Sequence, residues 1–501
     1  MPAADPKATP PAKNGDGNGK KNGNGEKNGK EEEPKVEKQY GFLVTFLRTY
    51  PTLQDWFPKC LDKDPPKKEG EEEAEPEPPR RGLPAPFSAP FPAQEWQIAP
   101  VIGAPLTTSV GPLQAALYTV PGLGDFMKDY RIRTYGWING SINSSTNKFS
   151  NGPDSYWLSA NRIELDQAVL KIEREVDSVQ KDHVDWGFRS CGLYGQDYRF
   201  TTAGGWGADQ LLVHNNRYGW DPIEQYFDVY IPYIADGVIL RTGRWVACPD
   251  IETQLAPDNY MGTHSILFTF DTYTQTGQEL TVKLNDHWTV QVGYNFGDDM
   301  APWYKNAPLC GFAGVRWVSE DNHDSVYTCL NQIDSAQFRH FTVNGQPAGH
   351  DNYNYVVSTY QHKFSDNFLT KQEGYFMWQR NAEVGGSPSL GPVEPYGGGG
   401  GDAPTIPGIT YTYGTVNYTC YKLNKLDFVT FRNEIWRDDK GMRSGFPGTY
   451  SSHSIGLSHN FTDYLQVRPE VGYYRNYNNP AFDNGQAKGC WIAGADCTIK
   501  F

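Results

Sequence analysis

The sequence has no run of about 18 consecutive apolar residues, the length that a transmembrane helix requires. A membrane role is therefore open only to strands that close into a barrel. Residues 1–40 also lack the apolar core of a secretory signal peptide. That absence counts against export, and if the rest of the chain indicates a barrel we expect a removed leader or a wrongly assigned start.

Basic residues are fewer than acidic ones, with 45 Lys and Arg against 59 Asp and Glu and a formal net charge of -14. Neutralising nucleic-acid phosphates requires clustered Lys and Arg on a folded surface. The only Lys-rich stretch lies in the polar N-terminal tail. We therefore expect no nucleic-acid partner.

Metal-binding and catalytic signatures are missing as well. The eight cysteines form no C-x-x-C pair and stand at no zinc-type spacing from histidine. There is no G-x-S-x-G, no H-E-x-x-H, no Walker loop and no G-x-G-x-x-G between a strand and a helix. We expect no metal, no cofactor, no catalytic residue and no enzyme, although a catalytic pair assembled by folding would escape this search.

Two of the cysteines carry a separate expectation. Cys310 and Cys329 lie at nearly equal distances on either side of an expected hairpin turn. They could face each other and form a disulfide in an oxidising compartment. Two small buried thiols are an equally good interpretation.

Aromatic residues are abundant, at 14% of the chain, and they are accompanied by 52 Gly. This balance favours many short strands and turns, so the expected fold class is all-β. Residues 1–86 are polar, low in complexity and rich in Pro and Glu, and we expect disorder with a short helix at 41–59. Residues 87–129 form a lead-in, and residues 130–501 form the β-rich part.

The β-rich part alternates between apolar and polar side chains. In the segment HWTVQVGYNF, Trp288, Val292 and Tyr294 fall on one face, while Gln291 and Asn295 fall on the other. A barrel strand between lipid and a wet lumen has this pattern. The sequence therefore predicts a transmembrane antiparallel β-barrel.

The positions of turn residues indicate the number of strands. Tight hairpins are marked at 236–237, 285–286, 365–367, 424–425 and 462–463, and the next connection is usually long. Short turns on one rim and long loops on the other are typical of outer-membrane barrels. We predict about sixteen strands, an even number that places both ends on the rim of short turns. They lie near 130–142, 160–175, 181–196, 223–234, 236–247, 274–285, 287–297, 309–319, 323–334, 351–364, 366–380, 410–423, 425–438, 448–461, 463–475 and 489–501.

The last predicted strand ends on an aromatic residue, Phe501, which shares a face with Trp491 and Ile499. A terminal aromatic residue in this setting resembles the signal by which outer-membrane barrels are recognised for insertion. It supports the barrel interpretation.

Five stretches together resemble a known family. They are DWGFRSCGLYGQDYRFTTAGG (185–205), GVILRTGRW (237–245), THSILFTFDTYTQTGQELTVKLNDHWTVQVGYNFGDD (263–299), LDFVTFRNEIWRDDKGMRSG (426–445) and FTDYLQVRPEVGYY (461–474). Their order and spacing resemble the putative β-barrel porin-2 family over about residues 130–501. The resemblance implies a Gram-negative-type outer membrane and a porin role. The long polar tail and the cysteines depart from the family pattern.

Charged residues on the polar face are candidates to line the pore, because Arg or Lys facing lipid at mid-depth costs about 2–4 kcal/mol. Arg432 and Glu434 lie two strands from Arg468 and Glu470 at similar heights, so a mixed ladder is expected; taken singly, each is better read as part of a solvated ion pair. Mixed signs at the wall predict weak ion selectivity. The net acidic charge of the chain tilts this selectivity slightly towards cations. The candidates are Glu279, Lys283, Arg316, Arg432, Glu434, Arg468 and Glu470.

The long connection 248–273 contains Asp250, Glu252, Asp258 and His264. It is the candidate to fold inward and constrict the pore, and an ordinary surface loop is an equal alternative.

These observations predict an outer-membrane porin that lets small hydrophilic solutes or ions diffuse passively. Its partners would be outer-membrane lipid and those solutes, and a homotrimer is expected by analogy alone. The alternative is a secreted or surface β-rich carbohydrate-binding or adhesion protein. That alternative would explain the many aromatic residues but not the alternation or the terminal Phe501.

Overall fold

The protein is described by a computed structural model that covers residues 101–154, 156–208, 210–214, 216–247, 250–305, 307–337, 342–343, 346–347, 353–387 and 404–501. The predicted disordered segment 1–86, with its helix at 41–59, lies outside these residues. So do Cys60, Cys248 and the start of the lead-in.

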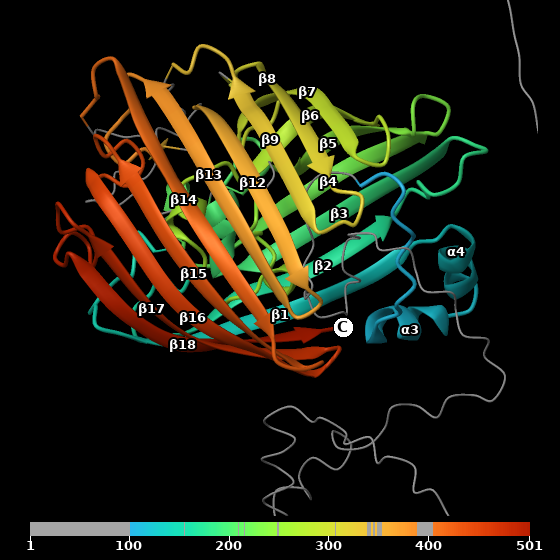
Figure 1. Cartoon of the computed structure of the whole chain (residues 1–501), viewed down its shortest axis with the longest axis horizontal. Coiled ribbons are helices and arrows are strands. Elements are labelled where there is room, and N and C mark those ends of the chain that lie inside the picture. The colour runs from blue at the N-terminus through green and yellow to red at the C-terminus, as the bar shows by residue number, and fades with distance from the viewer. Residues whose placement is uncertain are drawn as a thin grey trace, which may run out of the picture. The chain divides into compact units, whose positions relative to one another are not determined.

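Sixteen strands form one closed antiparallel barrel (Figure 1). Each pairs with the barrel strands before and after it in the chain, and β1 pairs with β18 to close the ring. The barrel strands are β1 (Arg133–Ser145), β2 (Ile163–Arg174), β3 (Asp185–Gly195), β4 (Gly219–Ile231), β5 (Val238–Val246), β6 (Thr274–Lys283), β7 (Trp288–Asp298), β8 (Cys310–Val318), β9 (Asp324–Ile333), β12 (Asn354–Ser365), β13 (Phe368–Arg380), β14 (Ile409–Lys422), β15 (Asp427–Asp438), β16 (Gly448–Thr462), β17 (Leu465–Asn476) and β18 (Gly489–Lys500).

The remaining elements are short. A separate two-stranded sheet consists of β10 (Thr342–Val343) and β11 (Gln346–Pro347). The helical segments are α3 (Pro112–Tyr118), α4 (Leu123–Asp129), η1 (Gln196–Thr201), α5 (Gln210–His214), η2 (Ala256–Asp258) and α6 (Ile266–Thr269). No helix in the described part of the chain is long and apolar enough to span a membrane.

The predicted strands are confirmed, since each of the sixteen segments overlaps one barrel strand. The ends shift by a few residues. The largest shifts are at the starts of β3 and β4, and β4 begins at Gly219 because residues 219–221 pair with β3 beyond a bulge between Cys191 and Leu193. Such irregularities leave no mark in a simple alternation of apolar and polar residues.

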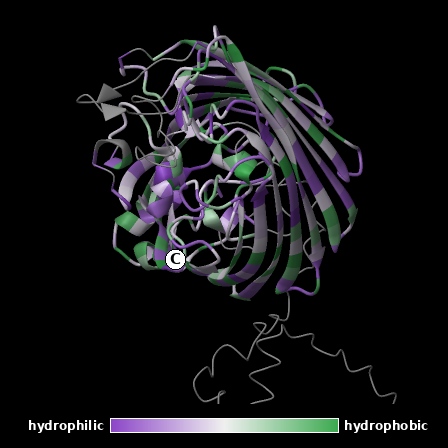
Figure 2. Ribbon diagram, turned by 90° about the vertical axis from the view of Figure 1, so that its left-hand side faces the viewer, coloured by the Kyte–Doolittle hydropathy of each residue, from purple (hydrophilic) through white to green (hydrophobic). Residues whose placement is uncertain are grey.

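Hydrophobic and hydrophilic residues alternate along the barrel strands (Figure 2), and exposure shows that the apolar ones lie outside the ring. In β7, Trp288, Val292 and Tyr294 are exposed, while Gln291 and Asn295 are buried. Exposed apolar side chains on other barrel strands include Ile138, Leu170, Phe227, Phe376, Phe431, Ile435, Ile455 and Val471. An apolar outer band is what the hydrocarbon of a membrane requires of a barrel.

The even number of strands brings both ends of the ring to the rim of short turns. Only residues 366–367 separate β12 from β13, and only 463–464 separate β16 from β17. Figure 1 shows α3, α4 and the C-terminus at this same end. The long connections lie on the opposite rim, as predicted.

The seam between β1 and β18 is extended by the terminal residue. The amide of Phe501 donates to the carbonyl of Gly136 (2.8 Å), and the amide of Gly136 donates to the carbonyl of Phe501 (3.0 Å). A Cβ at Gly136 would lie 2.1 Å from the Val169 carbonyl oxygen and 2.9 Å from the Phe501 ring. Only glycine fits this position. Because Gly136 has no side chain, the Phe501 ring can lie against it while the two backbones pair.

The predicted disulfide is wrong. Cys329 is a free, buried thiol, and the register places it opposite Gly314 rather than Cys310. The turn between β8 and β9 pairs Val318 with Ser325. In this register Cys310 lies further from the turn than Cys329 does, so the two cysteines do not face each other. A bulge between Gly311 and Ala313 shifts the register once more.

Candidate functional site

Segments of the chain lie inside the ring of strands (Figure 2), and contacts to the barrel wall place residues 250–273, called the inward loop below, among them. They connect β5 to β6, whose ends stay paired at Val246 and Thr274. Every residue of the inward loop except Asp258 is buried. A buried loop must find partners for its backbone amides and carbonyls, and here charged side chains of the barrel wall supply them.

The first such partner is Arg432 of β15. Its guanidinium donates to the Thr263 carbonyl (2.7 Å) and hydroxyl (2.9 Å), and to the Tyr474 hydroxyl (2.7 Å). Glu470 of β17 accepts the amides of Gly262 (3.1 Å) and Thr263 (3.0 Å) and lies 3.6 Å from Arg432. Arg432 and Glu470 thus form an ion pair between β15 and β17.

The second partner is Glu434, also on β15. It accepts the amides of Ile266 (3.0 Å) and Leu267 (2.5 Å), the first two residues of α6. Ser265 caps the same helix by accepting the amide of Phe268 (3.0 Å). The free amides at the start of α6 are thus satisfied by one loop residue and one wall residue.

The third partner is Arg468 of β17, whose charge is balanced by Asp496 of β18 (2.9 Å, Nε to Oδ1). The same guanidinium donates to the carbonyls of Ala256 (2.8 Å) and Asn259 (2.7 Å). A buried Arg paired in this way holds two turns of the inward loop against the wall.

Wall residues of β2 and β13 hold the first half of the loop. Gln167 of β2 donates to the Gln254 carbonyl (2.6 Å) and accepts the Ala256 amide (3.0 Å). Glu373 of β13 accepts the Ile251 amide (2.9 Å). Contacts to β2, β13, β15 and β17 mean that the loop extends across the lumen.

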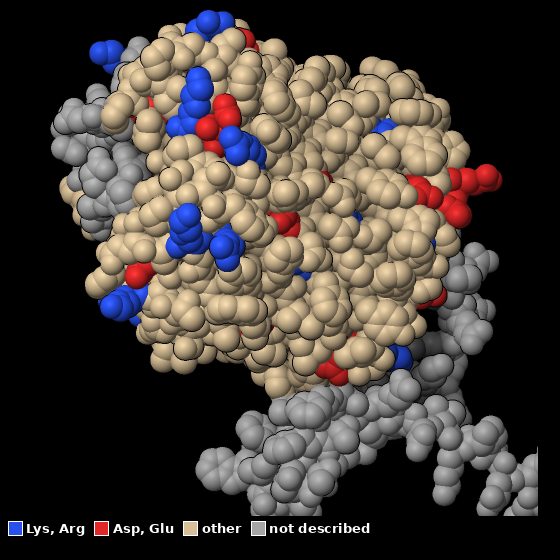
Figure 3. Space-filling model, turned by 60° about the vertical axis from the view of Figure 1, so that its left-hand side comes forward, with Lys and Arg blue, Asp and Glu red and all other residues tan. Residues whose placement is uncertain are grey.

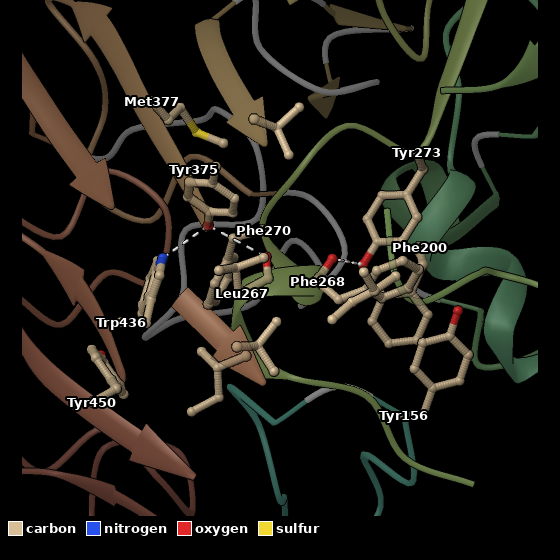
Figure 4. Close-up of a cluster of buried hydrophobic side chains, with 14 of the residues drawn as sticks. Tyr156, Phe200, Leu267, Phe268, Phe270, Tyr273, Tyr375, Met377, Trp436 and Tyr450 are labelled. Atoms are coloured by element: carbon tan, nitrogen blue, oxygen red, sulfur yellow. Dashed lines mark hydrogen bonds between the residues drawn. The ribbon is translucent and has the colours of Figure 1, made fainter. Parts of the chain in front are cut away.

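Apolar contacts complete the attachment on the side of β13 and β15 (Figure 4). Phe270 stacks on Trp436 with ring centroids 4.9 Å apart. The Tyr375 hydroxyl accepts from Trp436 Nε1 (2.8 Å) and donates to the Leu267 carbonyl (3.3 Å). Tyrosine and tryptophan thus pack their rings against the loop and satisfy their polar atoms.

Two ionisable residues of the inward loop are enclosed by it. His264 stacks on Tyr156 (centroids 3.8 Å apart), and burial lowers the pKa of its imidazole well below the usual value, so it is neutral at neutral pH. Burial raises the pKa of Glu252 to about 7, while Arg432 lowers it. Glu252 accepts the Ser265 amide (2.8 Å) and the Tyr418 hydroxyl (2.5 Å), so it links the start of the loop to the cap of α6 and to β14 of the wall.

Asp258 is the one half-buried residue of the inward loop. Burial raises the pKa of its carboxyl, and nearby Lys171, Arg189 and Lys500 lower it. Glu224, which pairs with Lys171 (3.2 Å) and Arg189 (3.0 Å), raises it. Asp258 thus faces a wall of mixed but mainly basic charge.

The wall from β1 to β6 carries a ladder of ion pairs in two groups, one across β1 to β4 and one across β4 to β6. Arg189 also contacts Glu173 (2.7 Å), and Arg241 contacts Asp228 (2.9 Å) and Glu279 (3.6 Å). On the exterior, the face drawn in Figure 3 carries charges of both signs in small groups. Neither sign dominates that face.

The seven pore-lining candidates fall into two groups. Arg432, Glu434, Arg468 and Glu470 are buried against the inward loop. Glu279 belongs to the ladder, while Lys283 contacts Asp286 (2.9 Å) near a short turn and Arg316 is half-buried on β8. The structure therefore brings the first four together and leaves the other three apart.

Several residues of the site were missed by sequence reasoning. Gln167, Tyr375, Tyr418 and Trp436 lie at inward positions of their strands and hold the loop. Their uncharged side chains look the same in sequence as those of any inward position. The only usable signal was the alternation, which shows that a residue faces the inside of the barrel but not which residue of the loop it binds.

The comparison with protein families agrees with this architecture. A model of the family described as "Putative beta-barrel porin-2, OmpL-like" matches residues 131–501. No curated protein matches the chain. Solved structures similar to it include the high-pH structure of Pseudomonas putida OprB, with 12% identity, a TM-score of 0.46, and 76% of this chain and 96% of that chain covered. The outer membrane channel DcaP of Acinetobacter baumannii is similar at 11% identity and a TM-score of 0.46, over 74% and 97% of the two chains. An anion-selective porin from Comamonas acidovorans is similar at 9% identity and a TM-score of 0.44, over 74% and 99%.

Proposed function

Because the chain belongs to the family described as "Putative beta-barrel porin-2, OmpL-like", we propose that it is a porin whose passive channel is narrowed from within by the inward loop. The protein is an outer-membrane porin for small hydrophilic solutes or ions, and family and fold indicate a channel rather than an enzyme. A barrel of 16–18 strands leaves an aqueous channel unless something enters it. The inward loop is the segment that enters it here.

The attachment of the loop to opposite sides of the ring is the observation that carries this proposal. A loop fixed only at its base between β5 and β6 would swing, but this one is also bound by Arg432 of β15, which stands opposite β5 in the order of strands. Gln167 and Arg468, on strands between these two, hold it as well. The resulting obstruction is rigid and restricts passage by size. Asp250 and Glu252, expected from the sequence to constrict the pore, act in this proposal as structural parts of the loop.

The open part of the channel passes beside Asp258. A carboxylate opposite Lys171 and Arg189 sets up a field across the passage, and the paired charges of the wall keep the net selectivity weak. Lys283 and Arg316 line the wider parts in the same proposal.

The test is the single-channel conductance of the purified chain in a planar bilayer after removal of the inward loop. Because the Ala247 amide donates to the Tyr273 carbonyl (2.8 Å), a short Gly-containing turn can replace residues 250–272 without opening the barrel. We expect a severalfold larger conductance than in the wild type. An unchanged conductance would contradict the proposal.

A matched control shortens a connection on the opposite rim, by deleting residues 179–183 between β2 and β3. Conductance should stay at the wild-type level. Both variants must migrate as folded barrels in cold SDS, which separates a changed pore from a damaged barrel.

A homotrimer is proposed for the assembly, on the size of the barrel alone. The mass of the protein in detergent, measured by light scattering, decides between one barrel and three.

A further inference from the structure

Three carboxylates meet at the two ends of the inward loop. Asp250 lies near its start, Asp271 near its end, and Glu373 reaches them from β13 of the wall. One oxygen from each lies within 4.8 Å of the others. All three side chains are more than nine-tenths buried, with 6%, 4% and 1% of their surfaces exposed.

No positive side chain balances this cluster within the described part of the chain. The arginines of the wall pair with carboxylates outside the cluster: Arg432 pairs with Glu470, and Arg468 pairs with Asp496. Burying three carboxylates together without a counter-charge is costly, so they must share protons or bind a cation.

Two of the carboxylate oxygens receive no hydrogen bond from an N–H or O–H donor, and the side chains of Asp271 and Glu373 both lie within hydrogen-bonding reach of Asp250. Glu373 uses Oε2 to accept the Ile251 amide (2.9 Å), which leaves the buried Oε1 without a hydrogen bond. Asp271 Oδ1 is likewise buried without a hydrogen bond. Asp250 Oδ1 accepts the Glu252 amide (2.9 Å), which fixes the orientation of that carboxylate.

We propose that Asp250, Asp271 and Glu373 bind a divalent cation, Ca²⁺, which fastens both ends of the inward loop to the barrel wall. Hard carboxylate oxygens are the ligands that Ca²⁺ takes. Two oxygens on opposite sides of Ca²⁺ lie about 5 Å apart, since each bond is about 2.3–2.6 Å long, so one ion bridges a cluster of this width. Mg²⁺ keeps several waters in a near-ideal octahedron and fits a buried cluster less well.

This site goes beyond the proposed function, because passive diffusion requires no metal. It was also missed by the sequence, which predicted none. Short spacings of Cys and His are the signs of a metal site that a sequence can show. These ligands instead come from positions up to 123 residues apart, the difference between 250 and 373. Only the inward fold of the loop makes them neighbours.

The test is Ca²⁺ uptake by the full-length protein in detergent after treatment with EDTA, measured by calorimetry. We expect one Ca²⁺ per chain with a dissociation constant of about 10⁻⁴–10⁻³ M, the range of extracellular Ca²⁺ sites. Asp271→Asn and Glu373→Gln should each weaken uptake at least tenfold. Carboxylates that merely share protons would take up no Ca²⁺, and that result would overturn the proposal, as would unchanged uptake in both variants.

A matched control is Asp438→Asn. Asp438 is as deeply buried, but its carboxylate accepts the amides of Met442 (3.0 Å), Arg443 (3.1 Å) and Ser444 (2.9 Å). This variant should keep wild-type Ca²⁺ uptake even if it is less stable.

A further measurement needs no variant and so does not depend on variant folding. Ca²⁺ should slow amide hydrogen exchange of the wild-type protein in peptides from 250–273 and around Glu373. Binding of Ca²⁺ that leaves these peptides unchanged would place the ion elsewhere and overturn the proposal. Conductance is not part of this test, so failure of the channel proposal would be seen separately.

Discussion

At the scale of single residues, Asp258 differs from the other acidic side chains of the inward loop because it is only half-buried. Asp250, Glu252 and Asp271 are enclosed by the loop and the wall. Asp258 instead lies near Lys171 and Arg189, where its charge offsets theirs. Its protonation state therefore determines how positive this part of the lumen is.

The first prediction concerns selectivity and pH. Burial raises the pKa of Asp258, while the basic residues Lys171, Arg189 and Lys500 partly lower it and Glu224 raises it. As the pH falls through this raised pKa, the carboxylate becomes neutral and the basic wall is no longer offset. The ratio of anion to cation permeability should rise, starting above the ordinary Asp value of about 3.9. Reversal potentials in salt gradients measure it.

Asp258→Asn should show the raised anion preference at every pH and lose this part of the pH dependence. Asp321→Asn is the matched control, because Asp321 lies on the rim of short turns in contact with solvent, between β8 and β9. Exposed charges are screened by salt. A selectivity shift of equal size in both variants would refute a special role for Asp258.

At the scale of elements, the inward loop depends on backbone groups that water does not reach. The second prediction is that Glu434→Ala loosens α6, because the amides of Ile266 and Leu267 lose their acceptor. Each buried amide left unsatisfied costs about 1–3 kcal/mol. Amide hydrogen exchange in peptides covering 262–271 should become at least about tenfold faster, with little change in the barrel strands.

Ile435→Ala is the control for this variant. Ile435 is the next residue of β15, and its side chain is exposed on the outer face. Exchange in 262–271 should keep its wild-type rate. Equal loosening in both variants would mean that β15 itself was damaged.

Much of the fold could be predicted from sequence because strands obey a local rule. The alternation of apolar and polar residues predicted all sixteen barrel strands. The turn residues predicted which connections lie on the rim of short turns. The site could be predicted only in part. Arg432 and Glu470 were correctly assigned to the inner face, but their binding to Thr263 depends on where a loop about 170 residues away comes to rest. The Cys310–Cys329 pairing failed because the turn pairs Val318 with Ser325 and so places Cys329 opposite Gly314.

At the scale of the whole molecule, the outer surface is adapted to hydrocarbon. The third prediction tests this with Phe431→Arg, which places a charge on the outer face near the middle of β15, where Phe431 is exposed. Arginine at the centre of a bilayer costs about 2–4 kcal/mol. Urea unfolding of the protein folded into lipid vesicles should show a loss of this size.

The same substitution near the rim provides the comparison. Tyr421 is exposed on the outer face next to the last residue of β14, beside a short turn. Tyr421→Arg should cost only about 0–1 kcal/mol, because the cost falls towards the interface. Equal losses at both positions would contradict a membrane-embedded outer face.

The seam between β1 and β18 also bears on how the barrel is made. Asn139 of β1 donates to Asp496 of β18 (2.8 Å), 357 residues further along the chain. Until the last strand arrives, the first strand and the growing end both present unpaired edges, which are templates for wrong pairing with another chain. Such distant pairing is slow because a long stretch of chain must be ordered first. Ring closure must therefore be the last step of assembly, and a newly made chain stays vulnerable to aggregation until its final twelve-residue strand is in place.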